Sequence, residues 1–205
     1  MSSLTRIVTW SQELACEVLN PGDLAVDLTA GKGRDTLSLA QAVGHTGQVV
    51  SFDTQAAALQ QTCELLQDHD YVVNNWTDDR EIPPGSQIVL VHACHSSLEK
   101  MLRRRPKAIM ANLGYLPGGD PALITGPEST LSALNQSLGL LSVGGRLAVT
   151  VYPAHAGGME EAQMVDDLFI SLPRDMWLVL LLRVANRGEA PYLLVAERLR
   201  RRSDA

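Results

Sequence analysis

Short apolar runs alternate along this chain with segments of helical periodicity, and this alternation limits the possible folds more than any other feature. The runs that we predict to be buried strands are residues 24–28, 48–52, 87–91, 107–111 and 146–151. The segments predicted to be helical are 35–43, a stretch that ends near 67, 96–104, 131–141 and 158–172. Strands that alternate with helices form a parallel sheet with right-handed crossovers. The sequence therefore predicts a doubly wound α/β fold.

The C-terminal part of the chain departs from this alternation. Two apolar runs, 177–184 and 192–196, flank the turn-forming sequence Asn186-Arg187-Gly188, which indicates an antiparallel hairpin. Val72 and Val73 could form a short strand, but residues 74–85 are polar and contain two consecutive prolines, so segment 71–85 is predicted to be mostly loop. The expectation is a mostly parallel, seven-stranded sheet with a C-terminal antiparallel hairpin.

We expect a single domain over residues 1–205, with an N-terminal helix within 1–22 and a basic tail at 199–205. The N-terminus lacks the unbroken apolar core of a signal peptide, and the longest apolar stretch is too short to cross a bilayer. Three scattered cysteines favour a reducing cytoplasm, and no metal-ligand spacing is present. These features predict a cytoplasmic protein with no metal and no membrane contact.

The net charge of −6 argues against a general nucleic-acid binder, but the charge is unevenly distributed. Arg103, Arg104, Arg105 and Lys107 form one basic cluster, and the arginines of 198–202 form another. Two interpretations remain open: a solvated helix end with a solubilising tail, or two groups of phosphate contacts.

Five polar or glycine-rich segments follow the predicted parallel strands. They are residues 29–33, 53–55, 92–95, 112–120 and 152–158. Parallel doubly wound sheets bind ligands beyond the carboxyl ends of their strands, at the point where the strand order reverses. These segments are therefore expected to form one ligand site.

The first of these segments is a glycine turn between a predicted strand and a predicted helix. Gly31 and Gly33 allow a tight turn and a close approach to a ligand, and Asp53 lies near the offset of about 20 residues expected for a ribose-binding acid. Thr36 occupies the place where a dinucleotide site has its third glycine. With Asp27 at the end of the first strand, the pattern favours the cationic S-adenosylmethionine over NAD. A helix N-cap is the alternative role for Asp53.

The segment that begins at Asn112 is the best candidate for substrate recognition. Asn112 and Tyr115 have the Asn-x-x-Tyr spacing with which many amino-methyltransferases hold a target nitrogen, although a tight turn is the alternative. His95 and His155 are equally compatible with structural and functional roles. Ser96 and Ser97 lack the G-x-S-x-G pattern of a hydrolase nucleophile.

Together these motifs resemble one bacterial family. The matching segments are 27–37, 52–55, 94–95, 112–120 and 155–161. The chain is similar over about 23–198 to the family long labelled "putative rRNA methylases". The resemblance implies a class I methyltransferase that converts the aminomethyl group of the tRNA wobble uridine, 5-aminomethyl-(2-thio)uridine, into a methylaminomethyl group. The implied cofactor is S-adenosylmethionine. The implied partner is the anticodon stem-loop of tRNA, with a homodimer left open.

The resemblance also implies site residues. The expected cofactor-binding residues are Asp27, Thr29, Gly31, Lys32, Gly33, Asp35, Thr36, Asp53, Gln55, Cys94 and His95. Asn112 is expected to orient the amine, and Tyr115, Asp120 and His155 are candidates to position it or to relay its proton. Cys94 stands where the family tends to have Ser or Thr, and Pro121 replaces a common Lys.

Three alternative functions remain: methylation of a small-molecule amine, an NAD-dependent oxidoreductase, and a non-catalytic RNA-binding module.

Overall fold

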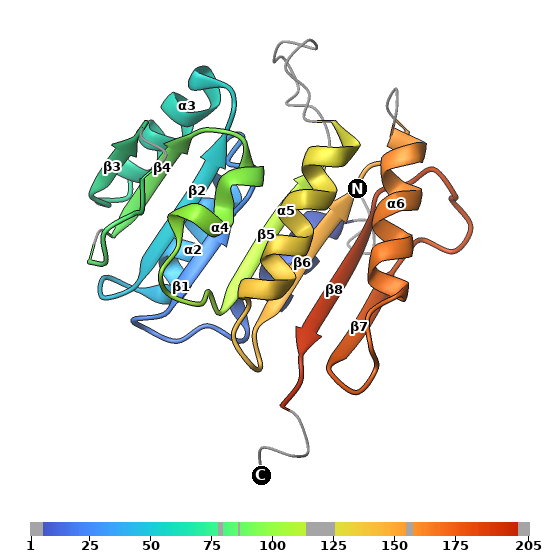
Figure 1. Ribbon diagram of the computed structural model, residues 1–205. Coiled ribbons are helices and arrows are strands. Elements are labelled where there is room, and N and C mark those ends of the chain that lie inside the picture. Colours follow the sequence, from blue (N-terminus) through green and yellow to red (C-terminus); the bar gives the residue numbers. More distant parts are fainter. Residues whose placement is uncertain (1–5, 78–79, 86, 114–125, 155–157, 201–205) are drawn as a thin grey trace.

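The computed structural model describes residues 6–77, 80–85, 87–113, 126–154 and 158–200. Its centre is one sheet, formed by β1 (Leu24–Asp27), β2 (Gln48–Asp53), β3 (Val73–Trp76), β4 (Ile88–His92), β5 (Ala108–Leu113), β6 (Arg146–Val151), β7 (Trp177–Leu182) and β8 (Tyr192–Arg198). The strand order is β3-β4-β2-β1-β5-β6-β8-β7 (Figure 1). All pairs are parallel except β6 with β8 and β7 with β8.

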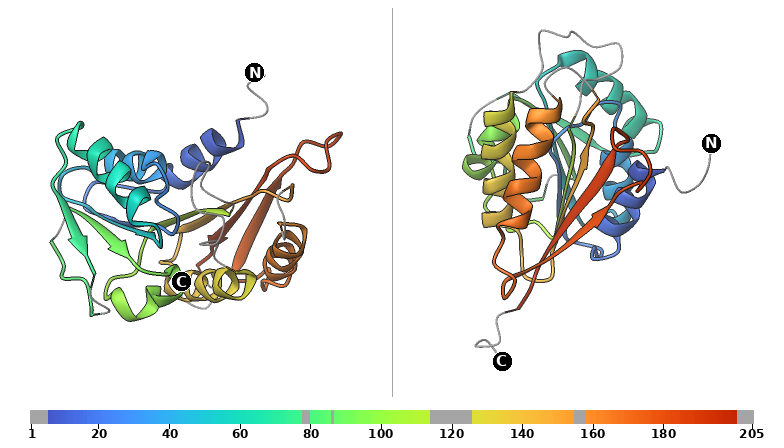
Figure 2. Two further views of the ribbon diagram at one scale, coloured as in Figure 1. Left: turned by 90° about the horizontal axis from the view of Figure 1, so that it is seen from above. Right: turned by 90° about the vertical axis from the view of Figure 1, so that its right-hand side faces the viewer.

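Helices cover both faces of the sheet in a three-layer arrangement (Figure 2). One layer contains α1 (Ile7–Cys16), α2 (Arg34–Val43) and α3 (Ala56–Gln67); the other contains α4 (Leu98–Met101), α5 (Pro127–Leu140) and α6 (Gly158–Ile170). Side chains of β5 alternate between the two apolar cores: Ile109 packs with one and Met110 with the other. No helix in the described part of the chain is long and apolar enough to cross a bilayer.

The predicted fold class is confirmed, but the predicted number of strands is wrong. The sheet has eight strands, because β3 adds a parallel edge strand beside β4 within the segment that we expected to be loop. An edge strand pairs on one side only, and the side chains of β3 are exposed or half-buried. Such a strand therefore lacks the continuous apolar run that made the central strands recognisable.

Two helix boundaries also differ from expectation. The helix after β2 begins at Ala56 with Gln55 as its N-cap, so the alternative role of Asp53 as a helix N-cap is wrong. The helix after β4 ends at Met101, short of the predicted 104, because Leu102 is extended and the Met101 carbonyl accepts a hydrogen bond from the Ile82 N–H at 3.0 Å.

The sheet has two chemically different ends. We call the end where β1, β2, β4, β5 and β6 terminate the carboxyl edge, and the opposite end the amino edge. Because β8 runs antiparallel to β6, Tyr192 pairs with Val151 at the carboxyl edge and Glu197 pairs with Arg146 at the amino edge. The loop between β7 and β8 therefore lies at the carboxyl edge (Figure 1).

Candidate active site

The glycine turn connects β1 to α2 at the carboxyl edge. Gly31 and Gly33 have φ angles of 53° and 77°, in the left-handed region that favours glycine. A Cβ atom on Gly33 would lie 2.9 Å from the Thr62 Cα of α3, so space as well as backbone geometry requires a glycine there. The turn is thus packed directly against the next helix.

Asp53, the last residue of β2, ties this turn to the start of α3. Its Oδ2 accepts a hydrogen bond from the Gly31 N–H at 2.9 Å, and its Oδ1 accepts one from the Gln55 N–H at 2.9 Å. A carboxylate oxygen can accept more than one hydrogen bond, so both oxygens retain capacity for a ligand hydroxyl. The proposed ribose contact of Asp53 and the contact of Gln55 remain predictions.

Asp27 is completely buried at the end of β1. Its oxygens accept hydrogen bonds from the Thr29 N–H at 3.0 Å and from the Thr36 hydroxyl at 2.7 Å, and that hydroxyl also lies 2.7 Å from the Ser51 hydroxyl. Burial raises the pKa of Asp27 to about 7, and the nearby Asp35 carboxylate contributes to the rise. Asp27 is therefore an acid that changes charge near neutral pH.

Asp35 and Asn112 meet although they are far apart in the sequence. Asp35, on the first turn of α2, is only 5% exposed. Its Oδ2 accepts a hydrogen bond from Asn112 Nδ2, and its Oδ1 accepts one from Gln12 Nε2 of α1 at 2.6 Å. Burial raises the pKa of Asp35, and the hydrogen bond from Gln12 opposes this rise. The Asn112 N–H donates to the Thr29 hydroxyl at 2.8 Å, which connects Asn112 to the glycine turn.

Two buried oxygens beside this pair have no hydrogen-bond partner among the described residues. They are Asn112 Oδ1 and Thr150 Oγ1. The two residues are paired in register on β5 and β6, so their side chains leave the same face of the sheet. Unsatisfied buried polar atoms are uncommon in folded proteins and often mark a ligand site. Tyr152 lies close by, and burial raises the pKa of its hydroxyl, with a further contribution from Asp35.

His95 lies in the short 3₁₀ helix η2 (His95–Ser97) behind β4 and is 4% exposed. Its Nδ1 lies 3.1 Å from the Leu28 carbonyl. A carbonyl can only accept, so Nδ1 carries the hydrogen and Nε2 is an acceptor, which no described residue bonds. Burial lowers the pKa of His95, which favours the neutral ring. Cys94, half-buried beside it, accepts a hydrogen bond from the Ser96 hydroxyl at 3.2 Å.

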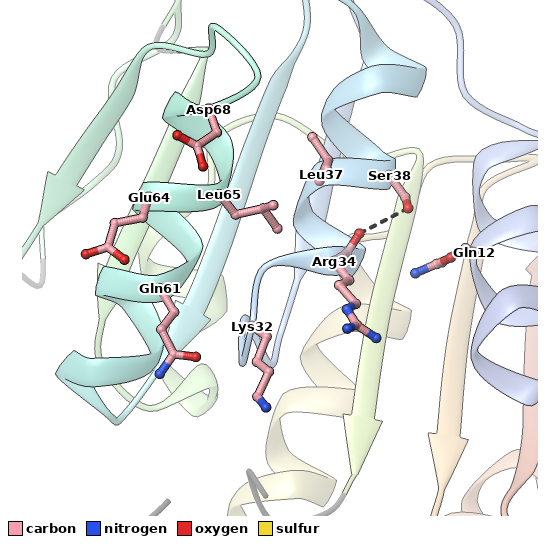
Figure 3. A pocket seen from close by; sticks show the side chains of 9 residues that line it. All are labelled: Gln12, Lys32, Arg34, Leu37, Ser38, Gln61, Glu64, Leu65 and Asp68. Atoms are coloured by element: carbon pink, nitrogen blue, oxygen red, sulfur yellow. Dashed lines mark hydrogen bonds between the residues drawn. The ribbon is translucent and has the colours of Figure 1, made fainter. Parts of the chain in front are cut away.

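Lys32 and Arg34 are exposed at the mouth of a separate groove between α1, α2 and α3 (Figure 3). The groove has a volume of about 560 Å³, and its other part is lined by two acidic side chains, Glu64 of α3 and Asp68 directly after it. Asn112 and Asp53 are not among its lining residues. Lys32 therefore lies beside the group of buried polar side chains around Asp35 and Asn112, and not inside it.

Several predicted site residues lie outside the described residues: Tyr115, Asp120, Pro121 and His155. The predicted residues that the structure does describe all lie at the carboxyl edge, where Asp27, Asp35 and Asn112 come together. Gln12 and Thr150 were not predicted. Gln12 lies on an amphipathic helix, where a glutamine carries no functional signal, whereas the place of Thr150 beside Asn112 follows only from the strand register.

The basic clusters lie at the amino edge. Lys107 immediately precedes β5, and Arg198 ends β8 opposite the beginning of β6. Arg105 donates to the carbonyls of Gly139, Leu140 and Leu141 at the end of α5, and Arg198 donates to two of these carbonyls. Their positions favour a structural role over contact with a substrate at the carboxyl edge. Arg201 and Arg202 lie outside the described residues.

Within the described residues, no group of three or more His, Cys, Asp or Glu side chains could hold a metal ion.

Comparisons with known proteins agree with this geometry. Residues 49–198 match a family model described as "Putative rRNA methylase". A chloroplastic "tRNA (mnm(5)s(2)U34)-methyltransferase" of Arabidopsis thaliana is 34% identical over 194 residues, which cover 91% of this chain and 65% of that protein. The present chain thus spans slightly less than two thirds of that relative.

Solved structures give the same result. A putative rRNA-methylase of Clostridium thermocellum has a TM-score of 0.83 and 30% identity, covering 94% of this chain and 97% of its own. A putative methyltransferase of Streptococcus mutans in complex with SAH has a TM-score of 0.79 and 30% identity, covering 95% and 98%.

Proposed function

Because this chain belongs to the family described as "Putative rRNA methylase", we propose that it is an S-adenosylmethionine-dependent tRNA methyltransferase that N-methylates the aminomethyl group of the wobble uridine. The membership confirms the resemblance drawn from the sequence motifs. The name of the Arabidopsis relative supports the wobble position, and the SAH complex of the Streptococcus structure supports the cofactor. A methyltransferase family leaves the NAD-dependent and non-catalytic alternatives without support.

The chemistry of the carboxyl edge suits this cofactor. S-adenosylmethionine carries a sulfonium and an ammonium group, and Asp27, Asp35 and Asp53 place carboxyl groups around the glycine turn. The left-handed glycines leave the backbone open to close approach. Asp53 is suited to the ribose hydroxyls, and His95 Nε2 offers a buried acceptor nearby. When bound, the cofactor supplies an electrophilic methyl group on sulfur.

The observation that carries the proposed reaction is the amide of Asn112. Its Nδ2 is committed to Asp35, and its Oδ1 is buried without a described partner at the end of β5. An amine nitrogen that donates a hydrogen to this oxygen has its lone pair directed elsewhere and free to attack a methyl donor. Asn112 therefore orients the attacking nitrogen, and positioning of this kind contributes strongly to rate.

The attacking amine must be uncharged, because a protonated amine has no free lone pair. Burial at the carboxyl edge lowers the pKa of an amine. The neutral form is also the form whose remaining hydrogens suit the two acceptors at this edge, Asn112 Oδ1 and Thr150 Oγ1. Positioning and desolvation then account for much of the catalysis, with Tyr115, Asp120 and His155 as candidates for the final proton transfer.

The tRNA is proposed to approach the carboxyl edge. Exposed cations that lie there include Arg6 beside the start of α1, Lys32 and Arg34 in and after the glycine turn, and Arg187 in the loop between β7 and β8. They offer phosphate contacts near the target nucleotide despite the net charge of −6. The anticodon stem-loop is the segment of tRNA that presents the wobble base.

Purified protein provides the direct test. Labelled S-adenosylmethionine is incubated with tRNA bearing 5-aminomethyluridine, with the same tRNA lacking the aminomethyl group, and with a free small-molecule amine. We expect label only in the first reaction, recovered as methylaminomethyluridine. Methylation of the free amine at a comparable rate would instead establish the small-molecule alternative.

A test in cells complements this experiment. Mass spectrometry of wobble nucleosides from a strain lacking the gene should show accumulated aminomethyluridine, and wild-type protein should restore the methylated nucleoside while an Asn112→Ala variant should not. The cytoplasm is the proposed compartment, whereas the name of the Arabidopsis relative places that protein in the chloroplast.

A further inference from the structure

We infer that Gln12 and Asp35 are positioning residues that fix the orientation of the Asn112 amide, so that the N-terminal helix takes part in holding the target nitrogen. The inference rests on the proposed function, in which Asn112 Oδ1 accepts a hydrogen from the amine. Gln12 and Asp35 lie outside residues 49–198, the segment that matches the family model.

The geometry forms a continuous chain of hydrogen bonds across three elements. Gln12 Nε2 of α1 donates to Asp35 Oδ1 at 2.6 Å, and Asn112 Nδ2 of β5 donates to Asp35 Oδ2. Each oxygen of the Asp35 carboxylate thus holds one amide. Because Asp35 is 5% exposed, water does not readily substitute for either donor.

A carboxylate between two amides removes an ambiguity that an asparagine otherwise has. The oxygen and nitrogen of an amide are nearly equal in size, and rotation by 180° exchanges them. Both oxygens of Asp35 accept hydrogen bonds here, so Asn112 presents Nδ2 to Asp35 and Oδ1 to the opposite side. The Asn112 N–H, bonded to the Thr29 hydroxyl, fixes the backbone from which this amide projects.

The helix that carries Gln12 is firmly attached to the sheet. Ile7, Ser11 and Ala15 are buried on its inner face. At its far end Arg146 of β6 donates to the Leu14 carbonyl at 2.9 Å and forms an ion pair with Glu17. Gln12 therefore belongs to a rigid element, and it donates to the Asp35 oxygen that Asn112 does not bond.

The decisive variant is Asp35→Asn, which preserves shape but changes the hydrogen-bond pattern. An asparagine at position 35 can accept from Gln12 with its oxygen, and its own NH₂ then faces Asn112. The Asn112 amide must turn its oxygen inward and expose a donor where the amine needs an acceptor. We expect kcat to fall about 100-fold, as for a misplaced reacting group, with the KM for tRNA little changed.

The reciprocal double variant Asp35→Asn with Asn112→Asp restores the complementary pattern. The amide introduced at position 35 can then donate to one oxygen of the carboxylate introduced at position 112, whose other oxygen faces the amine. A purely structural role for Asp35 predicts that the second substitution worsens the first. Our inference predicts that it recovers at least about tenfold of the lost kcat. Failure of this rescue, or an Asp35→Asn kcat within about threefold of wild type, would overturn the inference.

Gln12→Leu tests the N-terminal helix separately and does not touch the inner pair. We expect kcat to fall about tenfold, corresponding to one hydrogen bond to a charged group. Gln163→Leu is the matched control, because Gln163 Nε2 donates to Asp167 Oδ1 at 2.9 Å on the exposed side of α6. Equal turnover in the two variants would remove Gln12 from the positioning chain.

Two measurements separate this inference from the proposed function. If wild-type protein does not methylate aminomethyl-tRNA, the proposed function fails. The amide orientation remains testable in that case, because the Asn112 side-chain NH₂ resonance of labelled protein should shift in Asp35→Asn. An unmoved resonance would overturn the inference whatever the substrate is. Calorimetry with S-adenosylmethionine and thermal unfolding confirm that each variant is folded.

Discussion

The two ends of the sheet use polar side chains in opposite ways. At the amino edge, Arg105 and Arg198 donate to carbonyls at the end of α5, and Arg146 binds the Leu14 carbonyl together with Glu17 and Glu197. At the carboxyl edge, Asn112 Oδ1 and Thr150 Oγ1 are buried acceptors that no described residue satisfies.

The arginines of the amino edge stabilise the fold, whereas the polar side chains of the carboxyl edge are available to a ligand. A cation that satisfies helix-terminal carbonyls stabilises the fold and complements the helix dipole. A buried polar atom without a partner costs stability, and folded proteins retain such atoms mainly where a ligand satisfies them. The sign or density of charge alone does not distinguish the two uses. The lack of a partner alone does not either, because the buried Ser142 hydroxyl at the amino edge also has none among the described residues; the place of Asn112 beside the glycine turn is what marks the ligand site.

Asn112→Ala should give the largest effect and is the strongest test of the carboxyl edge. Removing the amide eliminates the oxygen that aims the amine, so the single-turnover rate should fall about 100-fold or more. Cofactor affinity should stay near wild type. Asn135→Ala is a matched control, because Asn135 lies on the exposed side of α5, where its Nδ2 donates to the Leu131 carbonyl. A rate within a few-fold of wild type would reduce Asn112 to a turn residue.

Asp53→Ala should weaken S-adenosylmethionine binding about 10- to 100-fold, the equivalent of one charge-assisted hydrogen bond of roughly 1.5–3 kcal/mol. The substitution also releases the Gly31 and Gln55 N–H groups. Asp53→Asn, which keeps one backbone acceptor, separates the two effects. Calorimetry provides the affinity, and unchanged binding in either folded variant would contradict the ribose contact.

The pH dependence should have opposite signs for binding and for stability. The pKa of Asp27 is raised to about 7, so this group is protonated below that pH. Affinity for the cationic cofactor should fall as the pH decreases below 7, by at most about tenfold per pH unit. The raised pKa instead favours folding at low pH, and this contribution is lost as the pH rises from the unfolded value of 3.8 through about 7.

Asp27→Asn should flatten both profiles. Titration calorimetry between pH 5.5 and 8 and denaturant unfolding over the same range measure the two quantities. A cofactor affinity that still falls below pH 7 in this variant would assign the titration to another group.

The smallest expected effect concerns tRNA affinity. Lys32→Gln with Arg34→Gln should weaken tRNA binding several-fold and reduce the salt slope by about one to two phosphate contacts. The amino-edge double variant Arg104→Gln with Arg105→Gln should leave both unchanged. It should lower stability by about 0.5–1 kcal/mol, because the α5 carbonyls lose a cation. A salt slope that changes only in the amino-edge variant would reverse our assignment of the two ends.

The sequence predicted the central part of the fold well, because strands buried on both faces appear as apolar runs. Residues 146–151 were predicted as a strand with its observed bounds, and the antiparallel hairpin of β7 and β8 is confirmed. β3 was not predicted, since an exposed edge strand such as Val73–Trp76 needs no such run. Local sequence patterns therefore identify buried central strands better than exposed edge strands.

The candidate site was partly predictable for the same reason. Asp27 and Asp53 end their strands and Asn112 is the penultimate residue of β5, so strand prediction alone places them at one edge. The hydrogen bonds of Asp35 join residues 23 and 77 positions away, and no local pattern reveals them. The position of the basic cluster could have been predicted, because Arg103–Lys107 precedes a parallel strand and must therefore lie at the amino edge.

The place of β8 between β6 and β7 has a consequence for the newly made chain. The ribosome makes β6 well before Tyr192–Arg198. The side of β6 that pairs with β8 is therefore unpaired until β8 has been made. An open apolar strand invites pairing with other chains until its partner arrives. Two backbone hydrogen bonds fix the end of β8: the Gly144 N–H donates to the Arg198 carbonyl at 2.6 Å, and the Arg198 N–H donates to the Gly145 carbonyl at 3.0 Å. Synthesis of β8 thus ends the period in which β6 is exposed to pairing with other chains.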